Sequence, residues 1–272
     1  MLGEIYKRRE LTWILVQRNL KIRYKNSALG FFWSLLTPGL MILMYAVFAR
    51  ILKFNTGSPN YLEFLVTGII VWQFTAGFLN DSLNAIVGNA NLVKKVFFPR
   101  IILPVSTVMA NAVNFLLTFV VLFLYLLLSG AANFSAFYWI VPAFALHLAL
   151  GIGLSCLCAT ANVFFRDTQH MIGVGSLAWF FLSPIFYAPE MQLGALKFQN
   201  PELGGIIFLN PMTGILATYR AALMGAPLMP EVAPGVMLSP FWLLLSGFVC
   251  IVIFFLGIKA LKAGDPHFGD VL

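Results

Sequence analysis

The sequence predicts an all-α integral membrane protein with six transmembrane helices, an N-terminal amphipathic helix on the cytoplasmic surface and re-entrant helices between the last two spans. Two observations support this class. Hydrophobic side chains make up 60% of the 272 residues and charged ones only 10%, with a mean hydropathy of +0.90, far outside the usage of soluble domains. The apolar residues also come in long runs without alternating polarity, so each run must satisfy its own backbone groups as a helix in lipid.

Six apolar runs approach the roughly twenty residues that a helix needs to cross the hydrocarbon core. The first begins at Phe31, after a basic stretch that lacks the order of a cleavable signal peptide, so we expect a span there. The third is long enough to tilt or to project beyond the lipid. The predicted spans are residues 31–52, 62–83, 101–128, 138–163, 170–187 and 240–260.

The basic residues predict the orientation of these spans. An even number of spans puts both termini on one side, and cytoplasmic loops carry the excess of Lys and Arg. Of the 17 basic residues, all but Arg50, Lys53, Lys197 and Arg220 fall on the side of the termini. Both termini are therefore predicted to be cytoplasmic, and the net charge of +7 indicates topology rather than nucleic acid binding.

Residues 4–24 mix apolar side chains with Glu, Lys, Arg and Gln at nearly helical spacing. Such a helix lies along the membrane surface with its basic face toward anionic headgroups. Two interpretations stay open at this point: a simple topology anchor, or an anchor that also contacts a cytoplasmic partner.

Residues 88–100 join the second and third spans through a short loop in which basic and aromatic side chains are neighbours. Pro99 should end any helix before it. Lys94 and Lys95 could be only topogenic charges at headgroup level, whereas Phe97 and Phe98 offer an apolar knob for a groove on a partner. The residues alone favour neither interpretation.

Residues 188–239 are too long for a hairpin and too interrupted by Pro and Gly for a simple span. Two short apolar stretches, 206–209 and 215–223, suit helices that enter the outer leaflet and turn back. Such broken helices are tolerated where they are buried in protein or line a cavity. This favours a pathway through the protein, with an ordinary extracellular loop as the alternative.

Several chemistries have no support in the sequence. No Gly is followed by Lys, so the phosphate-binding loop of an ATPase is missing and any ATP must be used by another chain. The three histidines are scattered, and Cys156, Cys158 and Cys250 fall within apolar runs, as small hydrophobes do. Ionisable residues near mid-membrane are nearly absent, Asp81 lying late in its span, which argues against ion-coupled transport. We expect no catalytic residue, metal or cofactor in this chain.

Aromatic residues are frequent within the predicted spans. Many must contact lipid or lie in the interfacial belts. The alternative is a channel lining, because flat aromatic faces stack on the apolar C–H faces of sugar rings and would let a long glycan slide. The candidates are Tyr45, Phe48, Trp72, Phe74, Phe78, Trp179, Phe180, Phe186 and Tyr187.

Short stretches in a fixed order carry a family resemblance. They are Arg23 to Gly30 running into Trp33 to Pro38, Leu92 to Pro99, Phe164 to Asp167, Ser183 to Tyr187, and Asn210 to Thr213 followed by Tyr219 and Arg220. In order and spacing they resemble the ABC-2 type membrane subunits of exporters for lipid-linked polysaccharides such as O-antigen, capsule and teichoic acid. They extend from the N-terminal helix to the last external segment.

The resemblance implies one ABC-2 type transmembrane domain over residues 1–272, in a bacterial cytoplasmic (inner) membrane. Its parts are an interface helix at 1–30, spans one to five within 31–187, an external gate segment at 188–239, the sixth span at 240–260 and a cytoplasmic tail at 261–272. It also implies a homodimer with two copies of a separate nucleotide-binding subunit, which would hold the ATP and Mg.

The resemblance further implies residue roles. The segment that docks on the ATPase would comprise Asn91, Leu92, Lys94, Lys95, Phe97, Phe98, Pro99 and Arg100. A polyprenyl pyrophosphate-linked glycan would need cations near the cytoplasmic leaflet, where Lys21, Arg23 and Lys25 stand, although attraction to headgroups explains them equally well.

The leading functional prediction is therefore a permease subunit, not an enzyme, of an ATP-driven exporter of lipid-linked polysaccharide. One alternative is an ABC-2 permease for a drug or a simple lipid. The other, from a different class, is an integral membrane enzyme or scaffold without an ATPase partner.

Overall fold

The computed structural model describes residues 7–25, 32–52, 60–96, 98–188, 201–229, 231–233 and 236–272. The helices are α2 (Arg9–Tyr24), α3 (Trp33–Leu52), α4 (Tyr61–Val87), α5 (Ala90–Lys95), α6 (Ile102–Ser129), η2 (Phe134–Trp139), α7 (Ile140–Phe164), α8 (Thr168–Leu182), η3 (Pro201–Leu209), α10 (Pro211–Met224), α11 (Phe241–Gly264), η4 (Asp265–His267) and α12 (Phe268–Val271). Two short strands, β1 (Glu231–Ala233) and β2 (Val236–Met237), pair antiparallel with Glu231 opposite Met237. Helices thus make up nearly all the regular structure of the described residues.

A helix lies at each predicted span, and four of these helices are long and apolar enough to cross a membrane. The four are α4, α6, α7 together with η2, and α11 together with η4. The described apolar part of α3, Trp33–Val47, is shorter, and α8 has 15 residues. At 1.5 Å per residue α8 spans about 22 Å, less than a hydrocarbon core of about 30 Å. The helical membrane class is confirmed, whereas the six-span topology stays a prediction.

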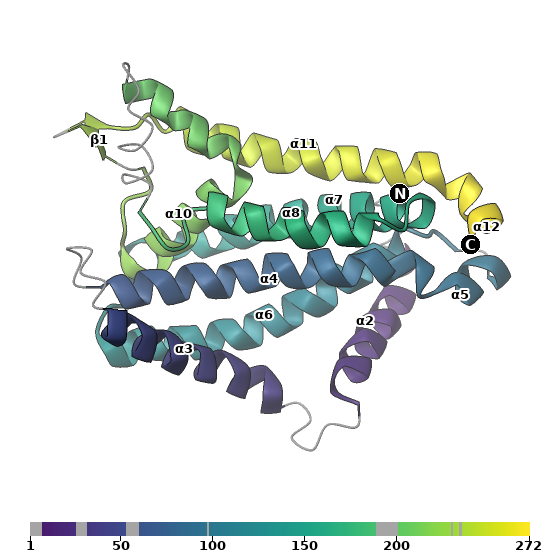
Figure 1. Ribbon diagram of the computed structural model, residues 1–272, viewed down its shortest axis with the longest axis horizontal. Coiled ribbons are helices and arrows are strands. Elements are labelled where there is room, and N and C mark those ends of the chain that lie inside the picture. Colours follow the sequence, from purple (N-terminus) through teal and green to yellow (C-terminus); the bar gives the residue numbers. More distant parts are fainter. Residues whose placement is uncertain are drawn as a thin grey trace.

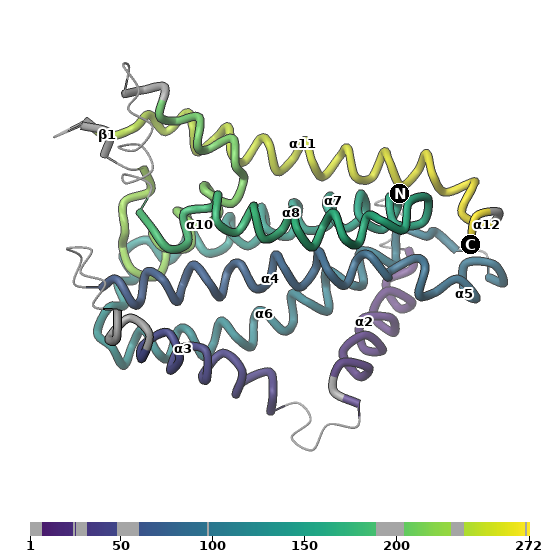
Figure 2. The backbone as a smooth tube through the Cα atoms, viewed as in Figure 1, coloured from purple at the N-terminus to yellow at the C-terminus, as the bar shows by residue number. Residues whose placement is uncertain are grey.

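The segments that were predicted to lie on opposite sides of the membrane are found at opposite ends of the bundle. Figure 1 shows α5, α12 and the C-terminus at one end, and α10 and β1 at the other. The helices between these ends run roughly along the long axis, whereas α2 crosses it and packs against α6. Figure 2 shows how the tube brings α5 and the C-terminal α12, far apart in the sequence, to the same end. This arrangement agrees with the predicted alternation of the spans, and the assignment of one end to the cytoplasm stays a prediction.

Helix α4 lies at the centre of the bundle and α11 at its edge. In their most apolar windows 67% of the α4 residues are buried within the chain, against 17% for α11. The buried face of α4 packs on α6 and α7. Large apolar side chains on α3, α8 and α11 remain exposed in the single chain, as Leu43, Val174 and Phe248 illustrate. These outer faces are available to lipid or to another chain.

Helices α7 and α11 pack closely because glycines face each other at their crossing. A Cβ atom at Gly257 would lie 2.0 Å from the carbonyl oxygen of Gly153, and one at Gly153 would lie 2.5 Å from that of Ile253. Small residues allow this approach in membranes, where helix association depends on close packing rather than on water exclusion. The edge helix is therefore attached to the bundle by backbone contact.

This contact predicts that Gly257→Ala destabilises the protein. The added methyl group meets rigid backbone, and such overpacking costs about 1–3 kcal/mol, which corresponds to a melting midpoint lower by about 5 °C in detergent. Gly247→Ala, on the same helix, is the matched control, because its Cβ would meet Leu146 at an ordinary 3.6 Å. Equal midpoints for the two variants in a fluorescence-detected melting assay would contradict the crossing geometry.

Candidate functional site

A polar cavity opens at the end of the bundle that holds α5, and we call it the inner cavity. It has a volume of about 800 Å³ and lies between α2, α4 and α6. Amide and charged side chains make up much of its wall. The lining residues are Arg18, Asn19, Ile22, Arg23, Asn80, Asp81, Leu83, Asn84, Ala85, Gly88, Asn89, Thr107, Ala110 and Gln169.

Arg23 ties three helices together at this cavity. Its guanidinium forms an ion pair with Asp81 of α4 and donates a 3.0 Å hydrogen bond to the side-chain oxygen of Asn111 on α6. The amide nitrogen of Asn111 in turn donates to Asp81 at 2.8 Å. Both members of the ion pair are more than one third exposed, at 36% and 43%, so the pair contributes about 1 kcal/mol or less to stability. It orients α2 more than it holds the fold together.

Arg18, five residues earlier on α2, lines the same cavity. It donates a 2.7 Å hydrogen bond to the side-chain oxygen of Asn89, the residue before α5. Its Nε atom is buried and has no hydrogen-bond partner among the described residues. Arg18 is four residues before Ile22, and Asn19 is four residues before Arg23, so the members of each pair are neighbours on the helix surface. This spacing is the signal in the sequence that indicates such neighbours, whereas the positive-inside pattern counts Arg18 only as a topology charge.

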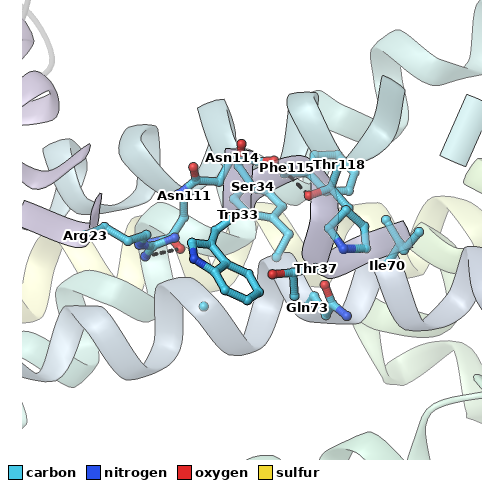
Figure 3. A pocket seen from close by; sticks show the side chains of 13 residues that line it. Arg23, Trp33, Ser34, Thr37, Ile70, Gln73, Asn111, Asn114, Phe115 and Thr118 are labelled. Carbon is cyan, nitrogen blue, oxygen red and sulfur yellow. Dashed lines mark hydrogen bonds between the residues drawn. The ribbon is translucent and has the colours of Figure 1, made fainter. Parts of the chain in front are cut away.

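A second, smaller pocket continues from Arg23 along α3, α4 and α6, and we call it the lateral pocket. Its volume is about 290 Å³. Figure 3 shows Arg23 beside Trp33 at one end and Thr118 at the other, with Thr37 and Gln73 between them. Its wall also contains Pro38, Phe74 and Phe115, so it is more apolar than the inner cavity. Arg23 lines both spaces.

The three cations predicted to contact pyrophosphate do not share one surface. Arg23 lines the inner cavity, whereas Lys21 and Lys25 line a second hollow of about 480 Å³ on α2, which Arg18 and Ile22 line as well. Both lysines are exposed. A contact with phosphate stays a prediction for all three, but the structure gives Arg23 a different setting from the lysines.

The predicted coupling segment forms α5 and the turn after it. Asn91, Lys94 and Lys95 are exposed, and Leu92 is half-buried. The helix ends at Lys95, before Pro99 as expected, and Pro99 and Arg100 are half-buried. Phe97 lies outside the described residues.

Phe98 does not form the exposed knob that one of the two interpretations of this loop requires. Only 7% of it is exposed, and it belongs to a buried cluster with Val93, Ile101 and Phe268. The ring anchors the segment to the bundle. Among the described residues of the segment, the exposed surface is carried by the polar residues of α5 and by Val96. The assignment of Phe98 to the coupling segment stays a prediction.

The C-terminal tail braces this segment. Arg100 donates to the backbone carbonyl of Asp265 and lies 3.1 Å from the Asp265 carboxylate. Its guanidinium is also 5.8 Å from the centre of the Phe268 ring, which has no exposed surface. Because α12 also contacts α5 directly, the tail packs against both α5 and the turn after it. The sequence placed 261–272 in the cytoplasm but predicted no contact for it.

The predicted channel aromatics fall into two groups. Between α4 and the end of α8, Trp72 lies 5.6 Å from Trp179 and 5.4 Å from Phe180, and Phe180 lies 5.0 Å from Phe186. Tyr45 and Tyr187 are half-buried, and the Tyr187 hydroxyl donates to the carbonyl of Phe181. The side chain of Phe48 lies outside the described residues.

The second group, Phe74 and Phe78, is in the core of the single chain. Phe78 has no exposed surface and Phe74 only 3%. Phe74 stacks on Phe115 at 5.0 Å and contacts His147, whose ring is completely buried and shares a 2.8 Å hydrogen bond with Thr75. In this conformation both rings pack helices together. The channel role of both groups stays a prediction.

At the opposite end, Asn210 connects α10 to the end of α8. Its side-chain oxygen accepts from the Trp179 indole at 2.7 Å and from the backbone of Met212 at 3.1 Å, and its nitrogen donates to Ser183 at 3.1 Å. Asn210 is thus the N-cap of α10, followed by Pro211, and Gly225 ends the helix with a positive φ of 63°. The short apolar stretch predicted at 215–223 is therefore a capped helix.

Arg220 on α10 is buried, which the sequence did not predict. Only 3% of it is exposed, and it donates to the carbonyl oxygens of Pro184 and Ile185 at 2.6 and 3.1 Å and of Phe64 at 3.2 Å. Pro184 and Ile185 follow the C-terminus of α8, where the helix dipole presents partial negative charge that stabilises a cation. Arg220 therefore joins α4, α8 and α10, and it is not a charge in a solvated loop.

Comparison with known proteins gives consistent relatives. Residues 10–224 match the ABC-2 type transporter family. An O-antigen export system permease protein RfbA of Klebsiella pneumoniae is 32% identical over 80% of this chain and 82% of its own length. A protein of the same name from Myxococcus xanthus is 32% identical over 81% of this chain and 83% of its own length. A polysialic acid transport protein KpsM of Escherichia coli is 21% identical over 77% of this chain and 80% of its own length.

The buried setting of Arg220 predicts that Arg220→Gln and Arg220→Lys both destabilise the protein. Glutamine leaves carbonyls without a donor, and lysine lacks the planar fork that reaches several acceptors. A loss of about 2–3 kcal/mol would lower the melting midpoint by about 5–10 °C. Arg166→Gln is the control because Arg166 is exposed. A midpoint for Arg220→Gln equal to that of the control would show that the bonds of Arg220 do not hold α10.

Proposed function

The chain belongs to the ABC-2 type transporter family, and we propose that it is the membrane-spanning permease subunit of an ATP-driven exporter of lipid-linked polysaccharide. The observation that carries this proposal is the similarity at 32% identity, over most of both chains, to two permeases named for O-antigen export. The similarity to KpsM at 21% is weaker, so an O-antigen-like glycan is favoured over a capsular polymer.

We propose six spans, with α3 and α8 crossing in addition to the four long helices and both termini in the cytoplasm. The position of α5 and α12 at one end and of α10 at the other supports this orientation, as does the excess of Lys and Arg at the first end. The membrane would be the bacterial inner membrane. In this arrangement η3 and α10 are the gate helices at the outer mouth, attached to α8 through Asn210 and Arg220.

Two copies of the chain would enclose the path, with two copies of a nucleotide-binding subunit beneath them. The chain contains no Gly followed by Lys, so ATP and Mg belong to that partner. The exposed lysines of α5 and the tail that braces this helix suit a docking surface of fixed orientation. The aromatic group around Trp72 and Trp179 is then the candidate lining for a sliding glycan.

The substrate prediction is tested by deleting the gene. Cells without the protein should lose surface glycan and accumulate lipid-linked glycan inside, because synthesis continues while transport stops. The measurement compares glycan staining of intact cells with that of permeabilised cells, and a plasmid-borne copy of the gene is the control. Unchanged surface glycan would refute polysaccharide export and leave a drug or simple lipid as the cargo of this family member.

The coupling prediction concerns Lys94 and Lys95. Reversing both charges with Lys94→Glu and Lys95→Glu should release the ATPase subunit from the affinity-purified permease, or leave ATP hydrolysis without export, because the exposed surface of α5 would no longer match its partner. Lys262→Glu is the control, because it reverses the charge of another exposed lysine, on α11. Full export by the doubly reversed variant in an assembled complex would remove this role from α5.

A further inference from the structure

We propose that the inner cavity binds a phosphate-bearing amphiphile through Arg18 and Arg23, and that Asp81 is an internal anion which holds Arg23 while the ligand is absent. This inference rests on the proposed function, because the ligand class is the phosphate-linked end of a lipid-anchored glycan. It moves the predicted phosphate contact from Lys21 and Lys25 to Arg18.

The charges of the cavity favour an anion. Its lining contains two arginines and one aspartate as ionisable residues, so it carries one positive charge beyond the pair of Arg23 with Asp81. That extra charge belongs to Arg18, whose hydrogen bonds in the structure go to the neutral side-chain oxygens of Asn89 and Asn19. An anion would supply the charged partner that the described residues do not supply there.

The geometry of Arg18 also favours a ligand. Its buried Nε has no partner among the described residues, and a buried donor left unsatisfied costs about 1–3 kcal/mol. A guanidinium presents its Nε and one terminal nitrogen as a fork that fits two phosphate oxygens. A phosphate in the cavity would satisfy the unpartnered atom, and Arg23, which lines the same cavity, would contact the same anion.

Asp81 makes the site reversible. The ion pair with Arg23 is more than one third exposed on both sides and therefore weak, so a phosphate with two negative charges can compete with one carboxylate. Asn111 contacts both partners, and it would remain to hydrogen bond Asp81 after Arg23 has moved. The structure thus shows the site with its internal anion in place.

The neutral lining indicates what is attached to the phosphate. Asn19, Asn80, Asn84 and Gln169 carry amides, which donate and accept hydrogen bonds as sugar hydroxyls do. The volume of about 800 Å³ is within the size of small-molecule sites and exceeds what a phosphate alone needs. On the far side of Arg23, Trp33, Phe74 and Phe115 give the lateral pocket an apolar wall for the start of a lipid chain. The two spaces would therefore hold the sugar and the lipid on either side of the phosphate.

The experiment measures binding of farnesyl pyrophosphate to the purified transporter complex in nanodiscs of neutral lipid, by calorimetric titration. We expect Arg18→Gln to weaken binding by about tenfold, because a charge-assisted bidentate contact is lost. Lys21→Gln, one turn along the same helix, should change it by less than about twofold, as exposed charges do. Asp81→Asn should tighten binding severalfold because the competitor is removed, and Arg18→Lys should fall between wild type and Arg18→Gln.

Equal losses for Arg18→Gln and Lys21→Gln, with normal elution of both on size exclusion, would overturn the assignment to the cavity. Weaker binding by Asp81→Asn would overturn the role of Asp81. A second series in nanodiscs that contain phosphatidylglycerol separates the two sources of phosphate: if this lipid abolishes the probe's binding, the cavity takes a headgroup and the substrate assignment fails. If the probe binds through Arg18 but deletion of the gene leaves the surface glycan intact, the proposed function is refuted and the anion site still stands.

Discussion

Polar groups inside this apolar bundle must find their partners within the chain, and this constraint shapes both ends of the molecule. A buried amide or charge without a partner is costly in a medium that offers no water. The Asn162 side chain donates to the carbonyl of Leu83 at 2.7 Å and so joins α7 to α4. Arg220 satisfies three carbonyl oxygens at once. In each case the polar group fixes how two or more helices lie against each other, which apolar contact alone would leave less specific.

Most of the fold could be predicted from the sequence because it depends on local patterns. Runs of apolar residues set the helices, and Asn210, Pro211 and Gly225 mark the ends of α10 with signals that act within a few residues. The separation of the two ends followed from the alternation of the predicted spans, whereas the cytoplasmic side that Lys and Arg assign stays a prediction. The α7–α11 crossing was out of reach, because Gly153 and Gly257 are 104 positions apart in the sequence and nothing local indicates that they face each other.

The site was less predictable because its contacts join distant segments. Arg23 and Asp81 are 58 positions apart, and Arg100 and Asp265 are 165 apart, so neither pair shows a sequence pattern. Phe98 and Arg220, one apolar and one charged, illustrate the same limit. One interpretation of the loop after Lys95 had Phe98 exposed, and Phe98 is buried. Arg220, in a Pro- and Gly-rich segment, was assigned to the external side, and it is buried too. Burial depends on which helices come together, and no single segment carries that information.

The bond between Arg18 and Asn89 links the inner cavity to the start of α5. Asn89 immediately precedes α5, and its amide nitrogen also donates to the carbonyl of Ala85 in the last turn of α4. A ligand that took Arg18 would withdraw a 2.7 Å hydrogen bond from the residue where α4 passes into α5. The opposite end of that segment is held by Arg100 and the tail, so a change at Asn89 would act on a helix fixed at one end only. Binding in the cavity and the orientation of α5 would then both depend on the hydrogen bond from Arg18 to Asn89.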